Sequence, residues 1–291
     1  MKVFVLSPHS YCEGVVKAFL IAKKAKREHP SSKIYLLGSL VHNEDATNQL
    51  VKDGFALIDE RKENLSESLG KIPDGSVVVF SAHGHPKQYE KKAKEKNLIV
   101  YDATCEFVKK NLDTIDYFTH NQKDIIFLGE KNHLEAVAAL SYGDKVHLMD
   151  SKRLNDFDFS KINDFAPTFI TQTTMSEDEV RETGKYILAH KPATFIIDGR
   201  CESTKRRQFN FYLAPKEADL IVVLGSLASN NTMKLVSIGK ESHPEARVFR
   251  ATNLDELKKY NLSKFHYAIL ATGASTSPNV FNDCLNYLKK I

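Results

Sequence analysis

Three of the four cysteines divide the chain so evenly that a shared inorganic site is the first chemistry to consider. Cys12, Cys105 and Cys201 divide the chain from residue 12 to residue 291 into three nearly equal parts. Each cysteine follows a short apolar run typical of a buried strand and precedes a stretch with helical periodicity. We therefore expect three thiols on three loops, each at the start of a helix.

Thiolates gathered at one point need a metal centre to offset their charge, and helix N-termini favour negative groups. Three thiolates suit a catalytic zinc with an open fourth position, or a [4Fe–4S] cluster in which one iron lacks a protein ligand. The donor set alone leaves both open, although wide spacing without a nearby fourth ligand is unusual for zinc. Cys284 differs, because it lies in the amphipathic segment 280–288 and is predicted to pack in the core.

Other features recur in step with these cysteines. A second apolar run ends at Gly38, Gly129 and Gly225, and polar residues follow shortly after each glycine. A third apolar run also ends in a small polar loop in each part, at 77–80, 168–170 and 268–270. The repetition indicates three copies of one unit in which strands and helices alternate.

The predicted fold class is α/β, with three pseudo-symmetric lobes that each contain a small, mostly parallel sheet. We expect lobes at 14–104, at 105–200, and at 201–291 together with 1–13. Loops beyond the carboxyl ends of parallel strands favour anions. Three lobes around a pseudo-threefold axis would turn these loops toward one central site for a phosphorylated ligand.

Composition narrows the class of protein. The 41 basic and 37 acidic residues leave a net charge of +4, far below the excess expected of a nucleic-acid binder. No run of eighteen apolar residues is present, and the N-terminus lacks the layout of a signal peptide. We therefore expect a cytoplasmic protein that binds neither nucleic acid nor a membrane.

Six short motifs give a more specific lead. They occur in this order: Cys12-Glu13-Gly14-Val15, Leu40-Val41-His42-Asn43, Ser81-Ala82-His83-Gly84, Asp102-Ala103-Thr104-Cys105, Thr171-Gln172-Thr173-Thr174 and Gly273-Ala274-Ser275. In this order, over nearly the whole chain, they resemble the 4-hydroxy-3-methylbut-2-enyl diphosphate reductases, the LytB or IspH family.

The resemblance implies an oxidoreductase for the last step of the non-mevalonate isoprenoid pathway. Such an enzyme removes the hydroxyl of (E)-4-hydroxy-3-methylbut-2-enyl diphosphate and forms isopentenyl and dimethylallyl diphosphate. The resemblance also implies a trefoil of three lobes around one [4Fe–4S] cluster per chain, held by Cys12, Cys105 and Cys201. A ferredoxin or flavodoxin type of protein would deliver the electrons.

Site residues follow from matching motif positions. The resemblance implies these ligands for the substrate diphosphate: His42, His83, Ser229, Asn230, Asn231 and Ser275. It places His133, Glu135 and Thr173 beside the hydroxyl as binding and catalytic residues, with Glu135 relaying a proton. Without the resemblance, a carboxylate in the first turn of a helix is explained by the helix dipole alone.

The chain departs from the family pattern at Glu130, Leu134 and Asn230, where members usually carry His, Pro and Ser. Two alternatives follow. The chain would be a divergent member that reduces another phosphorylated compound, or a protein whose cluster senses oxygen or redox state without turnover.

The sequence gives less specific predictions for basic and imidazole residues outside the motifs. The run Lys205-Arg206-Arg207 would either dock an acidic electron carrier or form a solvated helix face. Three histidines without motif support are expected at the surface: His85, His120 and His147.

Overall fold

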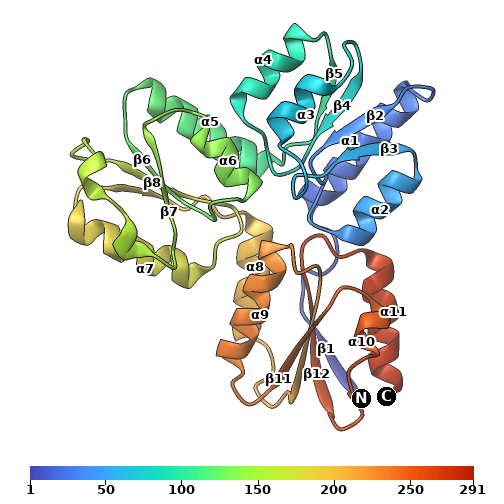
Figure 1. Ribbon diagram of the computed structural model, residues 1–291. Coiled ribbons are helices and arrows are strands. Elements are labelled where there is room, and N and C mark those ends of the chain that lie inside the picture. The colour runs from blue at the N-terminus through green and yellow to red at the C-terminus, as the bar shows by residue number, and fades with distance from the viewer. The chain divides into compact units, whose positions relative to one another are not determined.

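The protein contains three four-stranded sheets in which every paired strand is parallel, as a computed structural model of residues 1–291 describes (Figure 1). The strand orders are β3-β2-β4-β5, β7-β6-β8-β9 and β11-β10-β12-β1. The three sheets share one topology, in which the strand that comes first in the repeat lies between the second and the third. The predicted α/β class and the threefold repeat of the sheets are confirmed.

The strands are short, as expected for buried parallel sheets. Their bounds are β1 (Lys2–Val5), β2 (Ile34–Leu37), β3 (Phe55–Ile58), β4 (Val77–Phe80), β5 (Ile99–Asp102), β6 (Ile125–Leu128), β7 (Val146–Met149), β8 (Thr168–Thr171), β9 (Phe195–Ile197), β10 (Leu220–Leu224), β11 (Arg247–Ala251) and β12 (Tyr267–Thr272).

Helices connect the strands as parallel pairing requires. The α-helices are α1 (Glu13–Glu28), α2 (Glu44–Lys52), α3 (Leu65–Lys71), α4 (Lys87–Glu95), α5 (Glu106–His120), α6 (Leu134–Leu140), α7 (Glu177–His190), α8 (Glu202–Tyr212), α9 (Asn230–Ser242), α10 (Leu254–Leu257) and α11 (Pro278–Lys290). Two short 3₁₀ turns are η1 (Leu154–Asp156) and η2 (Phe159–Lys161). None of these helices combines the length and the apolar composition needed to cross a lipid bilayer.

The core lies on both faces of the inner strands. Every residue of β4, β6, β8 and β10 is buried, because helices cover both sides of each sheet. Cys284 is 0% exposed and packs with the apolar residues of α11 and β12, which confirms its predicted structural role.

The outer strands β3, β7 and β11 were not predicted. Each is the edge strand of its sheet and is less completely buried than its neighbour. In β11 the apolar pattern is interrupted by Arg247 and Arg250, and in β7 by His147. A strand open to solvent on one side tolerates such residues, so β7 and β11 lack the continuous apolar run that marks an inner strand, whereas β3 is apolar throughout.

The chain divides into two compact units. Unit 1 comprises Met1–Val16, His42–Ala46 and Cys201–Ile291, and unit 2 comprises Lys17–Val41 and Thr47–Arg200. In unit 1 the N-terminal β1 pairs with β12, so the first and last strands of the chain share one sheet (Figure 1). The boundaries of the three predicted lobes remain a prediction.

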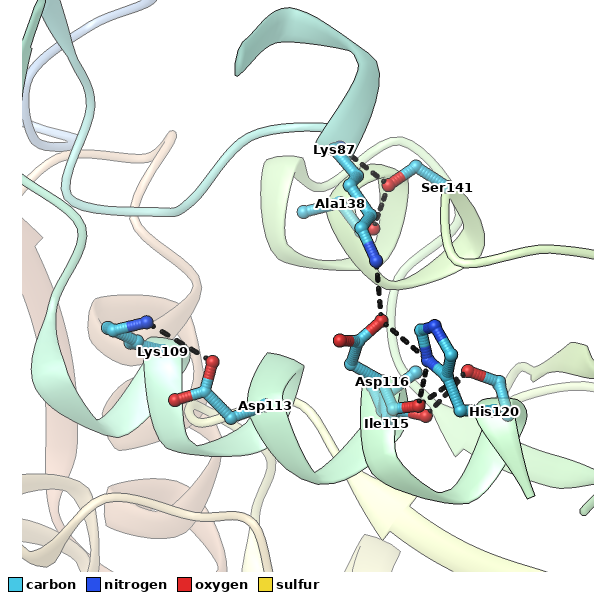
Figure 2. Close-up of polar contacts among 9 residues, drawn as sticks. Lys87, Lys109, Asp113, Ile115, Asp116, His120, Ala138 and Ser141 are labelled. Atoms are coloured by element: carbon cyan, nitrogen blue, oxygen red, sulfur yellow. Dashed lines mark hydrogen bonds and ion pairs between the residues drawn. The ribbon is translucent and has the colours of Figure 1, made fainter. Parts of the chain in front are cut away.

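Within unit 2, polar contacts tie the start of α4 to α5 and α6, as Figure 2 shows. The Lys87 ammonium pairs with Asp116 of α5 at 2.7 Å, and the Lys87 backbone N–H donates to the Ser141 hydroxyl at 3.0 Å. Ser141 caps the end of α6 by donating to the Ala138 carbonyl. These contacts anchor the loop before α4, which carries His83, against the helix that begins after His133.

Candidate active site

All three candidate ligand cysteines lie between a strand and a helix, as predicted. Cys12 directly precedes α1, while Cys105 and Cys201 are the N-cap residues of α5 and α8. All three are partly buried, and none forms a disulfide. The Cys201 sulfur takes the place of a capping oxygen, because it accepts the Thr204 backbone N–H at 3.3 Å. Each thiol therefore lies where helix dipoles favour an anion.

Cys12 and Cys201 belong to unit 1 and share a buried cation there. The side chain of Arg207 is 3% exposed and donates to the carbonyls of Pro8, Ser10 and Thr272. Burial lowers the pKa of Arg207 to about 10, and the nearby Cys12 and Cys201 thiols act in the opposite direction. The guanidinium therefore stays charged near neutrality.

This donor set fits an iron–sulfur cluster. The sulfurs lie at helix starts, and a buried guanidinium accompanies two of them. Cysteine thiolates hold such clusters, and the charges and hydrogen bonds around the sulfurs tune their reduction potential. Cys105 lies in unit 2, and the meeting of all three sulfurs remains a prediction.

The first turn of α9 in unit 1 holds buried polar groups that the protein leaves unpaired. Ser229 caps the helix by accepting the Thr232 backbone N–H. The Nδ2 of Asn230 and both polar side-chain atoms of Asn231 are buried and have no hydrogen-bond partner. Buried amides without partners are costly, and a helix N-terminus is suited to an anion.

Thr232 fits under this turn only because the neighbouring loops have glycine. A Cβ at Gly225 or at Gly273 would collide with the Thr232 hydroxyl. Gly225 directly follows β10, where the predicted second apolar run of this repeat ends, and Gly273 directly follows β12. They allow two strand-end loops to pack closely on the start of α9.

His42 and Ser275 are brought together in unit 1. The Ser275 hydroxyl donates to the His42 carbonyl at 3.0 Å. The side chain of Asn43 donates to the Ser275 carbonyl at 2.5 Å and accepts from the Ala46 backbone N–H at 3.0 Å. Asn43 therefore joins two loops that the site prediction assigned to the diphosphate, although it was not itself among the predicted site residues.

In unit 2, Glu135 and Thr173 form a closed pair. Glu135 is 4% exposed, and its Oε1 accepts the Thr173 hydroxyl at 2.6 Å while its Oε2 accepts the Thr173 backbone N–H at 2.9 Å. Burial raises the pKa of Glu135 to about 7, and the bonds from Thr173 act in the opposite direction. Such a carboxyl is present in both protonation states near neutrality.

Two imidazoles lie near this pair, one two residues before Glu135 and the other in contact with that first ring. His133 is the N-cap of α6, and its Nδ1 accepts the Glu135 backbone N–H at 3.2 Å. The His83 and His133 rings meet edge to face with centroids 5.7 Å apart. The structure thus brings together four of the predicted residues, namely His83, His133, Glu135 and Thr173.

Gln172, which lies in the motif Thr171-Gln172-Thr173-Thr174 but was not a predicted site residue, supports the same region. It is 0% exposed, and its Oε1 accepts the Glu130 backbone N–H at 3.0 Å. Its Nε2 donates to the Thr174 hydroxyl at 2.8 Å. A buried, fully engaged glutamine after a strand holds the turn that leads to His133.

Two predictions about basic and imidazole residues outside the motifs are wrong. Arg207 is buried, so it cannot belong to a docking triplet or to a solvated helix face. His85 and His147 have side chains only 11% and 15% exposed, because His85 packs on Phe80 and His147 contacts Asp124. His120 is 68% exposed, as expected.

Comparison with known proteins addresses the whole chain. The family model described as LytB protein matches residues 3–289. The 4-hydroxy-3-methylbut-2-enyl diphosphate reductase of Malacoplasma penetrans is 31% identical over 100% of this chain and 98% of its own length. The reductase of the same name from Bacillus pumilus is 32% identical over 99% of this chain and 91% of its own.

Solved structures give the same result. The E-1-hydroxy-2-methyl-but-2-enyl-4-diphosphate reductase of Plasmodium falciparum covers 99% of this chain with 88% of its own, at 26% identity and a TM-score of 0.89. A second structure, of (E)-4-hydroxy-3-methyl-but-2-enyl diphosphate reductase, has a TM-score of 0.67 at 24% identity over 100% of both chains and shows a shared fold. The motifs, the threefold sheet topology and the match over residues 3–289 together establish that this chain belongs to the LytB family.

Proposed function

We propose that the chain reductively removes the hydroxyl of (E)-4-hydroxy-3-methylbut-2-enyl diphosphate. The reaction breaks the carbon–oxygen bond, consumes two electrons and two protons, and yields water with isopentenyl or dimethylallyl diphosphate. It is the last step of the non-mevalonate isoprenoid pathway. Membership of the LytB family and the names of relatives 31% and 32% identical over the full length support this substrate.

The observation that carries the proposal is the buried pair of Glu135 and Thr173. A carboxyl whose pKa is raised to about 7 by burial can give a proton to a departing hydroxyl at neutral pH. Thr173 donates a hydrogen bond to each carboxyl oxygen and so fixes the orientation of the Glu135 carboxyl group. A protein that only sensed oxygen would need the cysteines but not this pair.

The cofactor in this proposal is one [4Fe–4S] cluster on Cys12, Cys105 and Cys201. When bound, it would supply the electrons and an iron with an open position that polarises the hydroxyl. The chain itself contributes the Arg207 cation, which offsets thiolate charge beside Cys12 and Cys201.

The diphosphate would occupy the polar loops of unit 1 together with His83. Ser229, Asn230 and Asn231 offer hydroxyl and amide donors at the start of α9, and the unpaired amides gain partners when an anion arrives. His42 and Ser275 are held together at the adjoining loops, and an imidazole can donate a hydrogen bond to a phosphate oxygen.

The electron donor in this proposal is a small acidic carrier of the ferredoxin or flavodoxin type, in the cytoplasm. Arg206 on α8 is exposed and available for such a contact, although it also pairs with Glu202 at 2.7 Å. Opposite charge would speed the encounter more than it would strengthen the complex.

Turnover by the cluster-loaded chain under anaerobic conditions tests the proposal. With a chemical reductant, we expect one product molecule for every two electrons consumed. A chain with a full complement of iron and sulfide that leaves this substrate unchanged would contradict the proposal. Reduction of another phosphorylated allylic alcohol by that same preparation would then identify the chain as a divergent member.

A further inference from the structure

Two buried polar residues occupy the same position after two of the cysteines. Asn111 is the sixth residue after Cys105 and lies on α5, and Arg207 is the sixth residue after Cys201 and lies on α8. They are 7% and 3% exposed.

Arg207 joins the Cys201 helix to the loop that carries Cys12. Its Nη2 donates to the Ser10 carbonyl at 2.7 Å, and its Nη1 donates to the Thr272 carbonyl at 2.9 Å. Ser10 is the second residue before Cys12 and has a φ of 61°, a conformation that non-glycine residues rarely adopt. The Ser10 backbone N–H in turn donates to the Thr272 hydroxyl at 2.8 Å. The loop is thus held from both sides.

Asn111 makes the corresponding contacts in unit 2. Its Nδ2 donates to the Gly199 carbonyl at 2.9 Å and to the Thr171 carbonyl at 3.1 Å. Gly199 is the second residue before Cys201, as Ser10 is before Cys12. A Cβ at Gly199 would collide with the Thr171 carbonyl and crowd the Asn111 amide, so glycine permits this close approach.

The two strand-end acceptors are equivalent by sheet register. Thr272 of β12 pairs with Leu224 of β10, and Thr171 of β8 pairs with Leu128 of β6. Both leucines are followed directly by the glycine that ends their strand. The same side-chain position therefore bridges the same two carbonyls in two copies of the repeat.

The remaining copy of the repeat has no such residue and does not need one. The sixth residue after the first cysteine is Ala18, which has no donor. Phe80, the register equivalent of the two threonines, already has its carbonyl paired with the backbone N–H of Ala103 at 3.2 Å. Ala103 is the second residue before Cys105, so backbone alone closes this loop.

The loops also differ in local support. Before Cys105, the side chain of Asp102 accepts the Thr104 backbone N–H at 2.9 Å, and before Cys201 the side chain of Asp198 accepts the Arg200 backbone N–H at 3.1 Å. Such turns hold a loop by its own sequence. The position before Cys12 that corresponds to these aspartates is His9, so this loop depends more on Arg207.

We propose that Asn111 and Arg207 are positioning residues that lock the loops before Cys201 and Cys12, each from the helix that begins at another cysteine. Buried carbonyls need partners. Removing Asn111 takes the donor from the carbonyls of Gly199 and Thr171, and removing Arg207 takes it from those of Pro8, Ser10 and Thr272. As a result, the loops are set in place before any cofactor binds. For the cysteines' role as cluster ligands, the inference rests on the proposed function, whereas the locking of the loops does not.

Amide hydrogen exchange on the full-length, cluster-free chain under reducing conditions tests the locking directly. Arg207→Met removes the donors but keeps an unbranched stem, and Asn111→Asp keeps the shape but turns an oxygen toward the carbonyls. We expect at least tenfold faster exchange in residues 6–14 for Arg207→Met and a smaller increase in residues 198–203 for Asn111→Asp. The matched controls are the exposed neighbours, Arg206→Met and Lys110→Met, which should leave both segments within twofold of the wild type.

Locking predicts a crossed pattern, in which Arg207→Met affects residues 6–14 and Asn111→Asp affects residues 198–203. General destabilisation would speed exchange in both segments. Equal acceleration of both segments by either variant, or exchange unchanged from the wild type, would overturn the inference. If Arg207→Met does not fold, Arg207→Lys keeps one donor and should give an intermediate rate in residues 6–14. Wild-type exchange in that variant would also overturn it.

A second readout uses the cluster-loaded chain. With a chelator present, Arg207→Met should lose its visible cluster absorbance fastest and Asn111→Asp more slowly, while the two control variants keep wild-type half-lives. A crossed exchange pattern without iron binding would sustain the locking and reject the proposed cofactor. Iron binding with identical half-lives in all variants would reject any effect of locking on the cofactor.

Discussion

Two regions of the molecule are built in opposite ways. One is the Glu135–Thr173 pair of unit 2, and the other is the segment 229–231 at the start of α9 in unit 1, hereafter the anion loop. Glu135 has both carboxyl oxygens engaged by Thr173, so its geometry is complete without a ligand. Asn231, at the start of α9, has both polar side-chain atoms buried and unpaired. Under the proposed function, the proton donor would be set in advance, while the binding loop would gain its missing hydrogen bonds from the ligand.

The largest effect is expected from removing the acid. Glu135→Gln keeps the shape of the side chain and abolishes proton transfer, so turnover should fall by about a hundredfold or more. Substrate KM should change little, because the anion loop is untouched. Steady-state kinetics of cluster-loaded variant and wild type decide this, and a variant with wild-type kcat would end the assignment of Glu135.

The raised pKa of Glu135 also predicts a pH-dependent stability. Burial raises this pKa from 4.5 to about 7, so the folded chain keeps a proton that the unfolded chain releases. The resulting stabilisation is complete below about pH 4.5 and is lost as the pH rises through about 7. Relative to Glu135→Gln, the wild type should therefore lose about 3 kcal/mol of unfolding free energy between pH 4.5 and 8. A difference that stays constant with pH in denaturant titrations would contradict the shift.

The anion loop should respond in binding. Asn231→Leu removes both unpaired groups at nearly constant volume, and we expect inorganic pyrophosphate to bind about tenfold more weakly because donors to the anion are lost. Titration calorimetry on the cluster-free chain measures this. Thr173→Val is the matched comparison in the other region and should leave pyrophosphate affinity unchanged. A similar loss of affinity in both variants would contradict the assignment of anion binding to the start of α9 alone.

The smallest effect is expected in the stability of the ligand-free chain, and it should have opposite signs in the two regions. Thr173→Val breaks a satisfied hydrogen bond and should destabilise by about 1 kcal/mol, whereas Asn231→Leu relieves unpaired buried amides and should be neutral or stabilising by about 1 kcal/mol. Thermal unfolding without ligand distinguishes the signs. Destabilisation by Asn231→Leu would show that its amide has partners after all.

Sequence patterns predicted the inner strands well because burial on both faces leaves an unmistakable apolar run, as in β4. They missed β11, where solvent on one side permits Arg247 and Arg250. Helix starts at the cysteines were predictable from the change of periodicity. Which side chain bonds a distant carbonyl was not, since such contacts join residues far apart in the chain.

Arg207 shows most clearly what sequence patterns could not predict. Next to Lys205 and Arg206 it reads as one member of a basic surface run, yet successive helical residues point in different directions, and only Arg207 turns into the core of unit 1. The same holds for Asn111, whose partners Thr171 and Gly199 lie in separate loops. Only their equal offsets from the cysteines were visible beforehand.

The central claim is that three distant cysteines share one iron–sulfur cluster, and metal analysis after anaerobic purification tests it most directly. We expect about four irons and four labile sulfides per chain in the wild type and in Cys284→Ser, because that thiol lies on α11 and is buried in the core. Serine at Cys12, Cys105 or Cys201 should abolish most of this content. Stoichiometric zinc without sulfide in the wild type, or equal losses from Cys284→Ser and Cys105→Ser, would contradict the account.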